Sequence, residues 1–237
     1  MVTFLTSSPT GDLDGKFRVD GIDYRNGFCE VLRTYWKENS RCLIVSASPD
    51  EIERNEEFAH FWFHALDVSG LSCTGVDLLD ARTMDISREE IQAYDVIVLG
   101  GGHVPTQNAF LHKMSLREKM EGFDGIVIGI SAGSMNAADV VYAQPEEEGE
   151  SLDPDYQRFL PGLGLTDINI LPHYQMLKDS WLDGQRLFED ITFPDSLGKK
   201  FLAIPDGSYV VIRDGYVSIH GEAWKITPEK MERIHFS

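Results

Sequence analysis

The stretch Gly125-Ile126-Val127-Ile128-Gly129-Ile130-Ser131-Ala132-Gly133 decides the fold of this chain. Its apolar first half is typical of a buried strand, and the small residues that follow are typical of a sharp turn into a helix. Bulk at Gly129 or Gly133 would collide with the adjoining strand or helix, and a serine on such a turn is a candidate nucleophile. Ser131 is that candidate. The alternative is an ordinary strand-to-helix turn, in which the same small residues also cluster.

Similar apolar runs recur along the first half of the chain, with helix-like segments between them. Residues 28–36 and 52–66 carry apolar and aromatic side chains at helical spacing, which predicts two helices packed on a sheet. The alternation of strands and helices indicates βαβ units and a mostly parallel sheet in an α/β fold. The expected strands are 2–5, 42–46, 75–79, 96–99 and 126–130.

The second half of the chain is less regular. A polar stretch with two prolines, residues 144–154, predicts a long surface excursion whose length is sufficient for a lid. We expect a strand at 168–171, a short helix near 184–188 and antiparallel strands over 201–219. Arg213-Asp214-Gly215 predicts the turn of a C-terminal β-hairpin.

Length and composition limit the classes of protein that this chain can belong to. A chain of 237 residues with 42% hydrophobic content is expected to form a single α/β domain over residues 1–237. The net charge of -18 argues against nucleic acid or an anionic membrane as partner, since both are polyanions. The unmatched cysteine count, the lack of a signal peptide and the lack of an apolar run approaching ~20 residues predict a cytoplasmic protein without a membrane span.

A serine nucleophile needs a base, and His173 is the best placed of the histidines. It follows the expected strand 168–171 and Pro172, so it lies at the carboxyl end of a strand, where open α/β sheets place their sites. A structural histidine is the alternative. His60 and His64 lie one helical turn apart but lack an obvious third ligand, so we expect no metal site.

Three consecutive glycines, Gly100 to Gly102, follow another expected strand. Their backbone N–H groups could approach a ligand closely, and one of them together with the N–H of Ala132 could form an oxyanion hole. A phosphate or dinucleotide loop is less favoured, because G-x-G-x-x-G spacing and a P-loop lysine are both missing. A turn without function is the remaining alternative.

The carboxylate that would orient the histidine is left open by the residues alone. Four glutamates lie between Ser131 and His173, and an aspartate follows 201–204. The candidates are Glu146, Glu147, Glu148, Glu150 and Asp206.

Taken together, the glycine loop, Gly129-Ile130-Ser131-Ala132-Gly133-Ser134 and Leu171-Pro172-His173-Tyr174 resemble the serine peptidase family that contains dipeptidase E and cyanophycinase. The resemblance extends from about residue 95 to 207. It implies a three-layer, flavodoxin-like sheet related to class I glutamine amidotransferases, with helices on both faces. It also implies hydrolysis of short peptides through an acyl-enzyme, without a metal or organic cofactor.

The resemblance also implies roles for particular residues. Ser131 is the expected nucleophile and His173 the general base, with the N–H groups of Ala132 and the Gly101-Gly102 region as the oxyanion hole. In the family the acid lies between serine and histidine, which favours Glu150, with Glu146 near the dipeptidase position.

Substrate choice follows less directly from the resemblance. Family members cleave beside aspartyl groups and hold the carboxylate with basic residues, which makes Arg186 a candidate clamp. The expected substrates are short peptides, including dipeptides with an N-terminal aspartyl residue. The alternatives are a cyanophycinase-like exopeptidase and an inactive binding relative, and a homodimer is left open as the oligomeric state.

Overall fold

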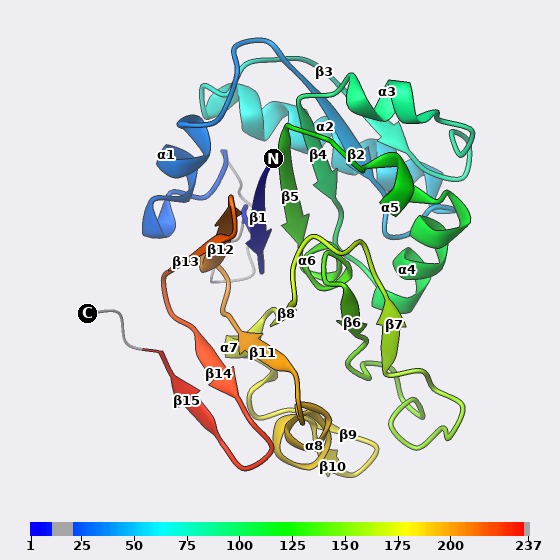
Figure 1. Cartoon of the computed structure of the whole chain (residues 1–237), viewed down its shortest axis with the longest axis vertical. Coiled ribbons are helices and arrows are strands. Elements are labelled where there is room, and N and C mark those ends of the chain that lie inside the picture. Colours follow the sequence, from blue (N-terminus) through cyan, green and yellow to red (C-terminus); the bar gives the residue numbers. More distant parts are fainter. Residues whose placement is uncertain (11–20, 235–237) are drawn as a thin grey trace.

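A seven-stranded sheet forms the centre of the computed structural model, which describes residues 1–10 and 21–234 (Figure 1). The strand order is β13-β12-β1-β5-β4-β2-β3. Neighbours from β1 to β3 run parallel, and β12 and β13 add an antiparallel hairpin at the edge beside β1. The bounds are β1 Val2–Thr6, β2 Ser40–Val45, β3 Cys73–Leu79, β4 Val96–Leu99, β5 Ile126–Ile130, β12 Tyr209–Arg213 and β13 Tyr216–His220.

Both faces of this sheet are buried under helices. All of β4 is buried, and its alternate side chains enter two different cores: Val96 and Val98 one, Ile97 and Leu99 the other. The first core is completed by α1 Phe28–Arg33 and α2 Ile52–Val68, and the second by α3 Arg88–Gln92, α4 Val104–Lys113 and α5 Leu116–Lys119. The expected α/β fold, with a mostly parallel sheet between helices, is confirmed.

A second sheet of four strands lies beyond the carboxyl ends of β1 and β5 (Figure 1). Its order is β15-β14-β11-β8, with bounds β8 Ile168–Leu171, β11 Lys200–Ala203, β14 Trp224–Ile226 and β15 Met231–Arg233. The antiparallel strands expected over 201–219 are present, since β11 pairs antiparallel with β14 and β12 with β13, but β11 also pairs in parallel with β8. Pro205 and Gly207, the latter at φ +86°, interrupt the chain after β11, so β12 enters the larger sheet instead.

Apart from the 3-10 helix Arg25–Gly27, which directly precedes α1, the remaining elements are short and lie around the smaller sheet. The helix expected near 184–188 begins later, at Leu187, because Asp183 and Gly184 both have positive φ and form a tight hairpin turn. That turn joins β9 Trp181–Leu182 to β10 Gln185–Arg186. The others are β6 Val140–Tyr142, β7 Phe159–Pro161, α6 Ala132–Asn136, α7 Tyr174–Leu177, α8 Phe193–Asp195, the 3-10 helix Arg25–Gly27 and the π-helix Leu187–Thr192.

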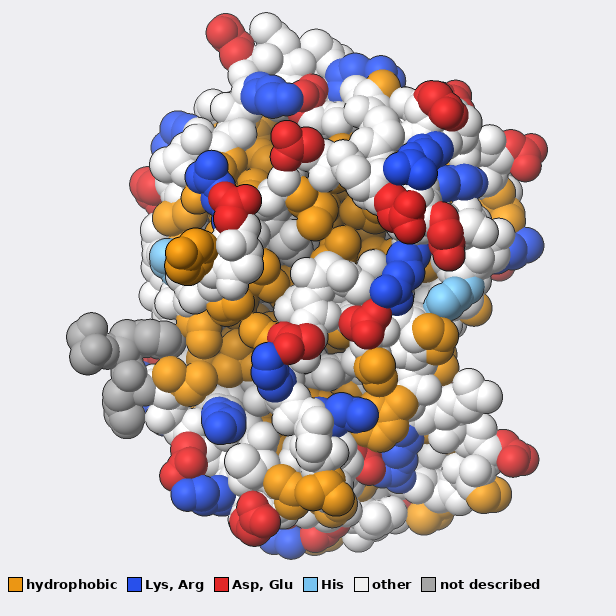
Figure 2. Space-filling model, in the orientation of Figure 1, with side chains coloured by type: hydrophobic (Ala, Val, Ile, Leu, Met, Phe, Trp, Pro, Cys, Tyr) orange, Lys and Arg blue, Asp and Glu red, His pale blue; other side chains and the backbone are white. Residues whose placement is uncertain are grey.

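The surface has mixed charge on the face that Figure 2 shows. Among the described residues there, lysine and arginine side chains lie between acidic ones instead of forming one continuous basic area. No helix within residues 1–10 and 21–234 combines the length and the hydrophobicity that a membrane span requires.

Candidate active site

Ser131 occupies a strained turn between β5 and α6. Its backbone has φ +50° and ψ -111°, a combination that L-residues rarely adopt. The glycines around it are required by contact: a Cβ on Gly129 would lie 2.7 Å from Ser134 Cα, and one on Gly133 would lie 2.1 Å from the carbonyl oxygen of Leu99. Strand β5 and its turn therefore hold the serine hydroxyl at the carboxyl edge of the larger sheet.

His173 reaches Ser131 from the smaller sheet. It follows β8 and Pro172 and adopts a left-handed conformation, φ +57° and ψ +29°, at the start of α7. Its Nε2 lies 2.9 Å from Ser131 Oγ, within hydrogen-bond distance. The structure thus brings together the serine and the histidine that the sequence analysis singled out, from two different sheets.

The carboxylate on the far side of His173 belongs to Asp206. Oδ1 of Asp206 lies 2.8 Å from Nδ1 of the imidazole. Burial by itself would raise the pKa of Asp206, but hydrogen bonds from His173 and Ser7 outweigh it and hold that pKa below its usual value. An ionised Asp206 requires a proton on Nδ1, which leaves the Nε2 lone pair to accept the hydroxyl proton of Ser131.

Ser7 supports both partners of this pair and was missed by the sequence analysis. The residue is fully buried, and its hydroxyl donates to Asp206 Oδ1 at 2.5 Å. The same oxygen accepts the backbone N–H of His173 at 2.8 Å. A signal was present in the sequence: Ser7 directly follows the first apolar strand, as Ser131 and His173 follow theirs.

Glu150, the favoured acid of the sequence analysis, lies elsewhere. Its carboxylate accepts the backbone N–H groups of Glu146 and Glu147 at 2.8 and 3.0 Å, and it lies 3.3 Å from Nε2 of His103. Glu150 therefore closes its own loop and contacts a different histidine. Of the candidates that the sequence left open, the structure brings Asp206 to His173, because the parallel pairing of β8 and β11 brings their two ends together.

The glycine loop lies directly beside the nucleophile. A Cβ on Gly101 would lie 3.4 Å from Ser131 Cβ, and one on Gly102 would lie 2.8 Å from Ala47 Cβ. Within the described part of the chain, the N–H groups of Gly101, Gly102 and Ala132 make no backbone hydrogen bond. They are therefore free to donate to an oxyanion formed at Ser131.

Arg186 does not take part in this arrangement. Its guanidinium forms a two-point ion pair with Asp190, at 3.0 and 2.6 Å, on the exposed side of β10. The pair holds the pKa of Asp190 down at about 2, and the arginine does not line the cavity at Ser131. The residue is close to His173 in sequence, but its charge is already paired.

A cavity of about 250 Å³ opens beside the nucleophile. Its walls come from the glycine loop, the 144–146 segment, α7 and the β9–β10 hairpin. They consist of Gly102, Val104, Ser131, Met135, Gln144, Pro145, Glu146, Pro172, His173, Leu177, Ser180, Trp181, Leu182 and Leu187.

Comparison with known proteins identifies the family of the chain. The sequence model of peptidase family S51 matches residues 30–220, so the chain belongs to peptidase family S51. Membership of this family supports serine peptidase activity. No curated protein sequence matches the chain.

Solved structures of other proteins share the fold, among them the following two. A peptidase from an acI-B1 Actinobacterium superposes with a TM-score of 0.64 at 16% identity, over 98% of this chain and 93% of the other. A protein assigned as peptidase E from Listeria monocytogenes EGD-e gives a TM-score of 0.57 at 18% identity, over 92% and 96%. At these identities the likeness concerns the fold.

Proposed function

We propose that this chain is a serine-type peptidase that hydrolyses short peptides through an acyl-enzyme on Ser131. The observation that carries the proposal is the continuous chain of hydrogen-bond distances from Ser131 Oγ through His173 to Asp206. Nucleophile, base and orienting acid need this order of contacts for covalent catalysis.

The reaction follows from the positions of these groups. As Ser131 Oγ attacks the peptide carbonyl carbon, Nε2 of His173 takes the hydroxyl proton and Asp206 stabilises the imidazolium. The N–H groups of Ala132 and of Gly101 or Gly102 stabilise the oxyanion. His173 then gives its proton to the leaving amine, the C–N bond breaks, and water attacks the acyl-serine ester by the same route in reverse.

Asp206 is the acid in this proposal, in place of Glu150. Asp206 alone among the candidate carboxylates contacts the imidazole within the described residues, and Ser7 and Gln175 hold it there. Glu150 has a structural role instead, because it accepts two backbone N–H groups of the 144–150 loop.

The aspartyl preference expected from the family resemblance is not part of the proposal. Among the described residues that line the cavity there is no lysine or arginine to bind a substrate carboxylate. A basic clamp is the element that such a preference requires.

The test is hydrolysis of a dipeptide panel, Leu-Leu, Ala-Ala, Asp-Leu and Arg-Leu, followed by release of free amine. The proposal predicts turnover of at least one member and, for that member, a loss of about 10⁴-fold or more in Ser131→Ala. Binding without turnover would favour an inactive relative. Turnover at an undiminished rate in Ser131→Ala would overturn the proposal.

A further inference from the structure

We propose that the cavity beside Ser131 selects short peptides with an unblocked amino terminus and an apolar residue next to the scissile bond, and that Glu146 binds the terminal ammonium. The inference rests on the proposed peptidase function and adds the substrate class.

The floor of the cavity is apolar and firmly packed. Val104, Met135 and Leu187 line it and are almost fully buried, at 3%, 6% and 5% exposure. Pro145 and Leu177 extend the same surface. An apolar side chain that enters this space is removed from water without loss of a hydrogen bond, which favours binding.

The rim carries a large aromatic side chain that is mostly exposed. Trp181 is 67% exposed and lines the cavity from the β9–β10 hairpin. A tryptophan presented in this way gains contact area when an apolar ligand residue lies against it, and such aromatic side chains often anchor ligands.

The charge of the cavity excludes one class of substrate and favours another. Apart from His173, Glu146 is the only acidic or basic side chain among the described lining residues. The carboxylate of an aspartyl residue would enter beside another carboxylate without a lysine or arginine to balance it. A cationic group is attracted by the same arrangement.

Glu146 is about half exposed, and the basic group closest to its carboxylate among those the structure describes is His103, whose Nε2 lies 3.8 Å from Oε1. Partial burial and the nearby Glu150 and Glu147 raise its pKa, and His103 and the Val104 N–H offset this only in part. A bound ammonium would compensate the anionic carboxylate. Because the cavity of about 250 Å³ is smaller than the ~300–1,000 Å³ of typical ligand sites, one substrate residue supplies both the side chain and the ammonium.

Hydrogen bonds connect the segment that carries Glu146 to the hairpin that carries Trp181. Asp183, at the turn of the β9–β10 hairpin, accepts the N–H of Gly149 at 2.8 Å and the hydroxyl of Ser151 at 2.6 Å. The 144–150 loop with Glu146 is therefore held against the hairpin with Trp181, and both present their side chains to the same cavity.

The experiment measures binding separately from turnover. Calorimetric titrations of Ser131→Ala with Leu-Leu, Asp-Leu and N-acetyl-Leu-Leu report affinity in a protein that lacks the proposed nucleophile. We expect Leu-Leu to bind about tenfold or more tightly than either of the other two, which corresponds to about 1.4 kcal/mol. Equal or tighter binding of Asp-Leu, or no binding of any peptide, overturns the inference.

A second pair of variants tests the role of Glu146. Added to Ser131→Ala, Glu146→Gln is expected to weaken Leu-Leu about tenfold and to leave N-acetyl-Leu-Leu unchanged. The matched control is Glu147→Gln, because Glu147 is the adjacent exposed glutamate of the same loop and does not line the cavity. Equal effects of the two substitutions contradict the assignment. Binding of Leu-Leu to Ser131→Ala without hydrolysis by the unmodified protein would refute the peptidase function and leave the binding specificity standing.

Discussion

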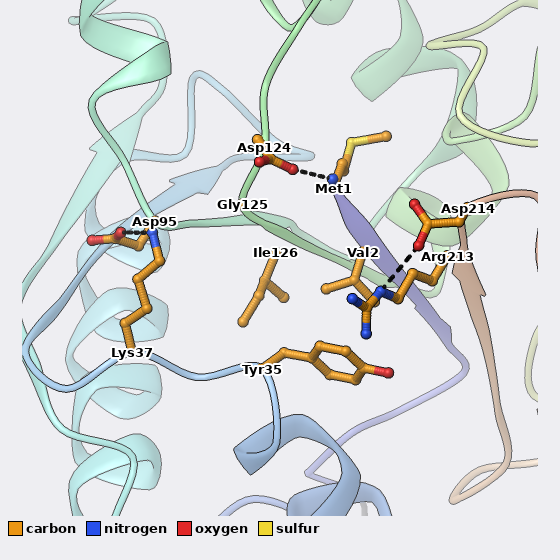
Figure 3. A pocket seen from close by; sticks show the side chains of 10 residues that line it. All are labelled: Met1, Val2, Tyr35, Lys37, Asp95, Asp124, Gly125, Ile126, Arg213 and Asp214. Atoms are coloured by element: carbon orange, nitrogen blue, oxygen red, sulfur yellow. Dashed lines mark hydrogen bonds and ion pairs between the residues drawn. The ribbon is translucent and has the colours of Figure 1, made fainter.

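Two hollows lie at opposite edges of the larger sheet, and they differ in how their charged and polar groups are paired. The first hollow lies at the amino ends of β1 and β5, and its charged groups form ion pairs with one another (Figure 3). The pairs are the Met1 amino group with Asp124, Lys37 with Asp95, and Arg213 with Asp214. That hollow, of about 200 Å³, has a similar size to the cavity at Ser131.

At the carboxyl edge, the polar groups form a chain of hydrogen-bond distances instead of separate ion pairs. Ser131, His173 and Asp206 form one directed chain, and no lysine or arginine accompanies Glu146 among the described residues that line the cavity. The comparison shows that the size of a hollow does not identify a site. The direction of the strands does, because parallel strands bring the residues that follow them to one edge.

The largest effect on kcat is expected for Ser131→Ala, and Lys37→Ala in the other hollow is its control. Ser131→Ala should lower kcat for Leu-Leu by about 10⁴–10⁶-fold, because it removes the attacking oxygen. Lys37→Ala should leave kcat unchanged, because Lys37 pairs with Asp95 at the far edge. Both are read from initial rates of amine release, and a comparable loss in Lys37→Ala would break the comparison.

The next effect separates the two carboxylates that compete for the role of acid. Asp206→Asn should lower kcat by about 10⁴-fold, since an amide at this position favours the wrong imidazole tautomer. Glu150→Gln should cost far less, because Glu150 holds backbone N–H groups of its own loop. A larger loss of kcat in Glu150→Gln than in Asp206→Asn would instead identify Glu150 as the acid, as the family resemblance implies.

A smaller loss is expected for the residue that positions this acid. Ser7→Ala removes the hydrogen bond to the ionised carboxylate and the acceptor of the His173 N–H, so kcat should fall about tenfold to a hundredfold while KM stays close to its original value. Because the Ser7 hydroxyl lowers the pKa of Asp206, its removal raises that pKa, and activity lost through protonation of Asp206 should be lost at a higher pH than in the unmodified protein. Ser7→Thr, which keeps the hydroxyl, should recover much of the rate, and a KM effect alone would speak against positioning.

The smallest effect concerns stability, and here the two hollows should behave alike. Asp206 has a pKa below its usual value, and so has Asp95, where burial is outweighed by the Arg41 N–H and Lys37. Each ionised carboxylate therefore stabilises the fold above the unfolded value of about 3.9, and this contribution is lost as the pH falls through the lower folded pKa.

Urea unfolding of the unmodified protein, Asp206→Asn and Asp95→Asn across this range provides the measurement. Both variants should lose less stability on acidification than the unmodified protein, while Asp206→Asn alone loses activity. Identical pH slopes in all three proteins would contradict the two pKa directions.

Local sequence patterns are sufficient to predict the larger sheet and most of the candidate site. Buried strands followed by Ser131, by the glycine loop and by His173 were all recognised, because each signal lies within a few consecutive residues. The hairpin of β12 and β13 was recognised from its turn for the same reason.

The parts that sequence reasoning misplaced depend on pairing between distant segments. Asp206 meets His173 because β8 and β11 pair in parallel, whereas chain order favoured Glu150. Arg186 is near His173 in sequence, but its guanidinium forms an ion pair with Asp190, four residues further on. A serine such as Ser7 has a role only once the fold brings His173 and Asp206 around it.

The central claim is that peptide hydrolysis proceeds through an acyl group on Ser131. The most direct measurement is intact and peptide mass analysis of the protein quenched in acid during turnover of a leucine ester, in parallel with steady-state hydrolysis by Ser131→Ala. We predict one leucyl adduct on the peptide that contains Ser131 and a hydrolysis rate in the variant that is close to background. An adduct on another residue, or hydrolysis by Ser131→Ala at the rate of the unmodified protein, would contradict the claim.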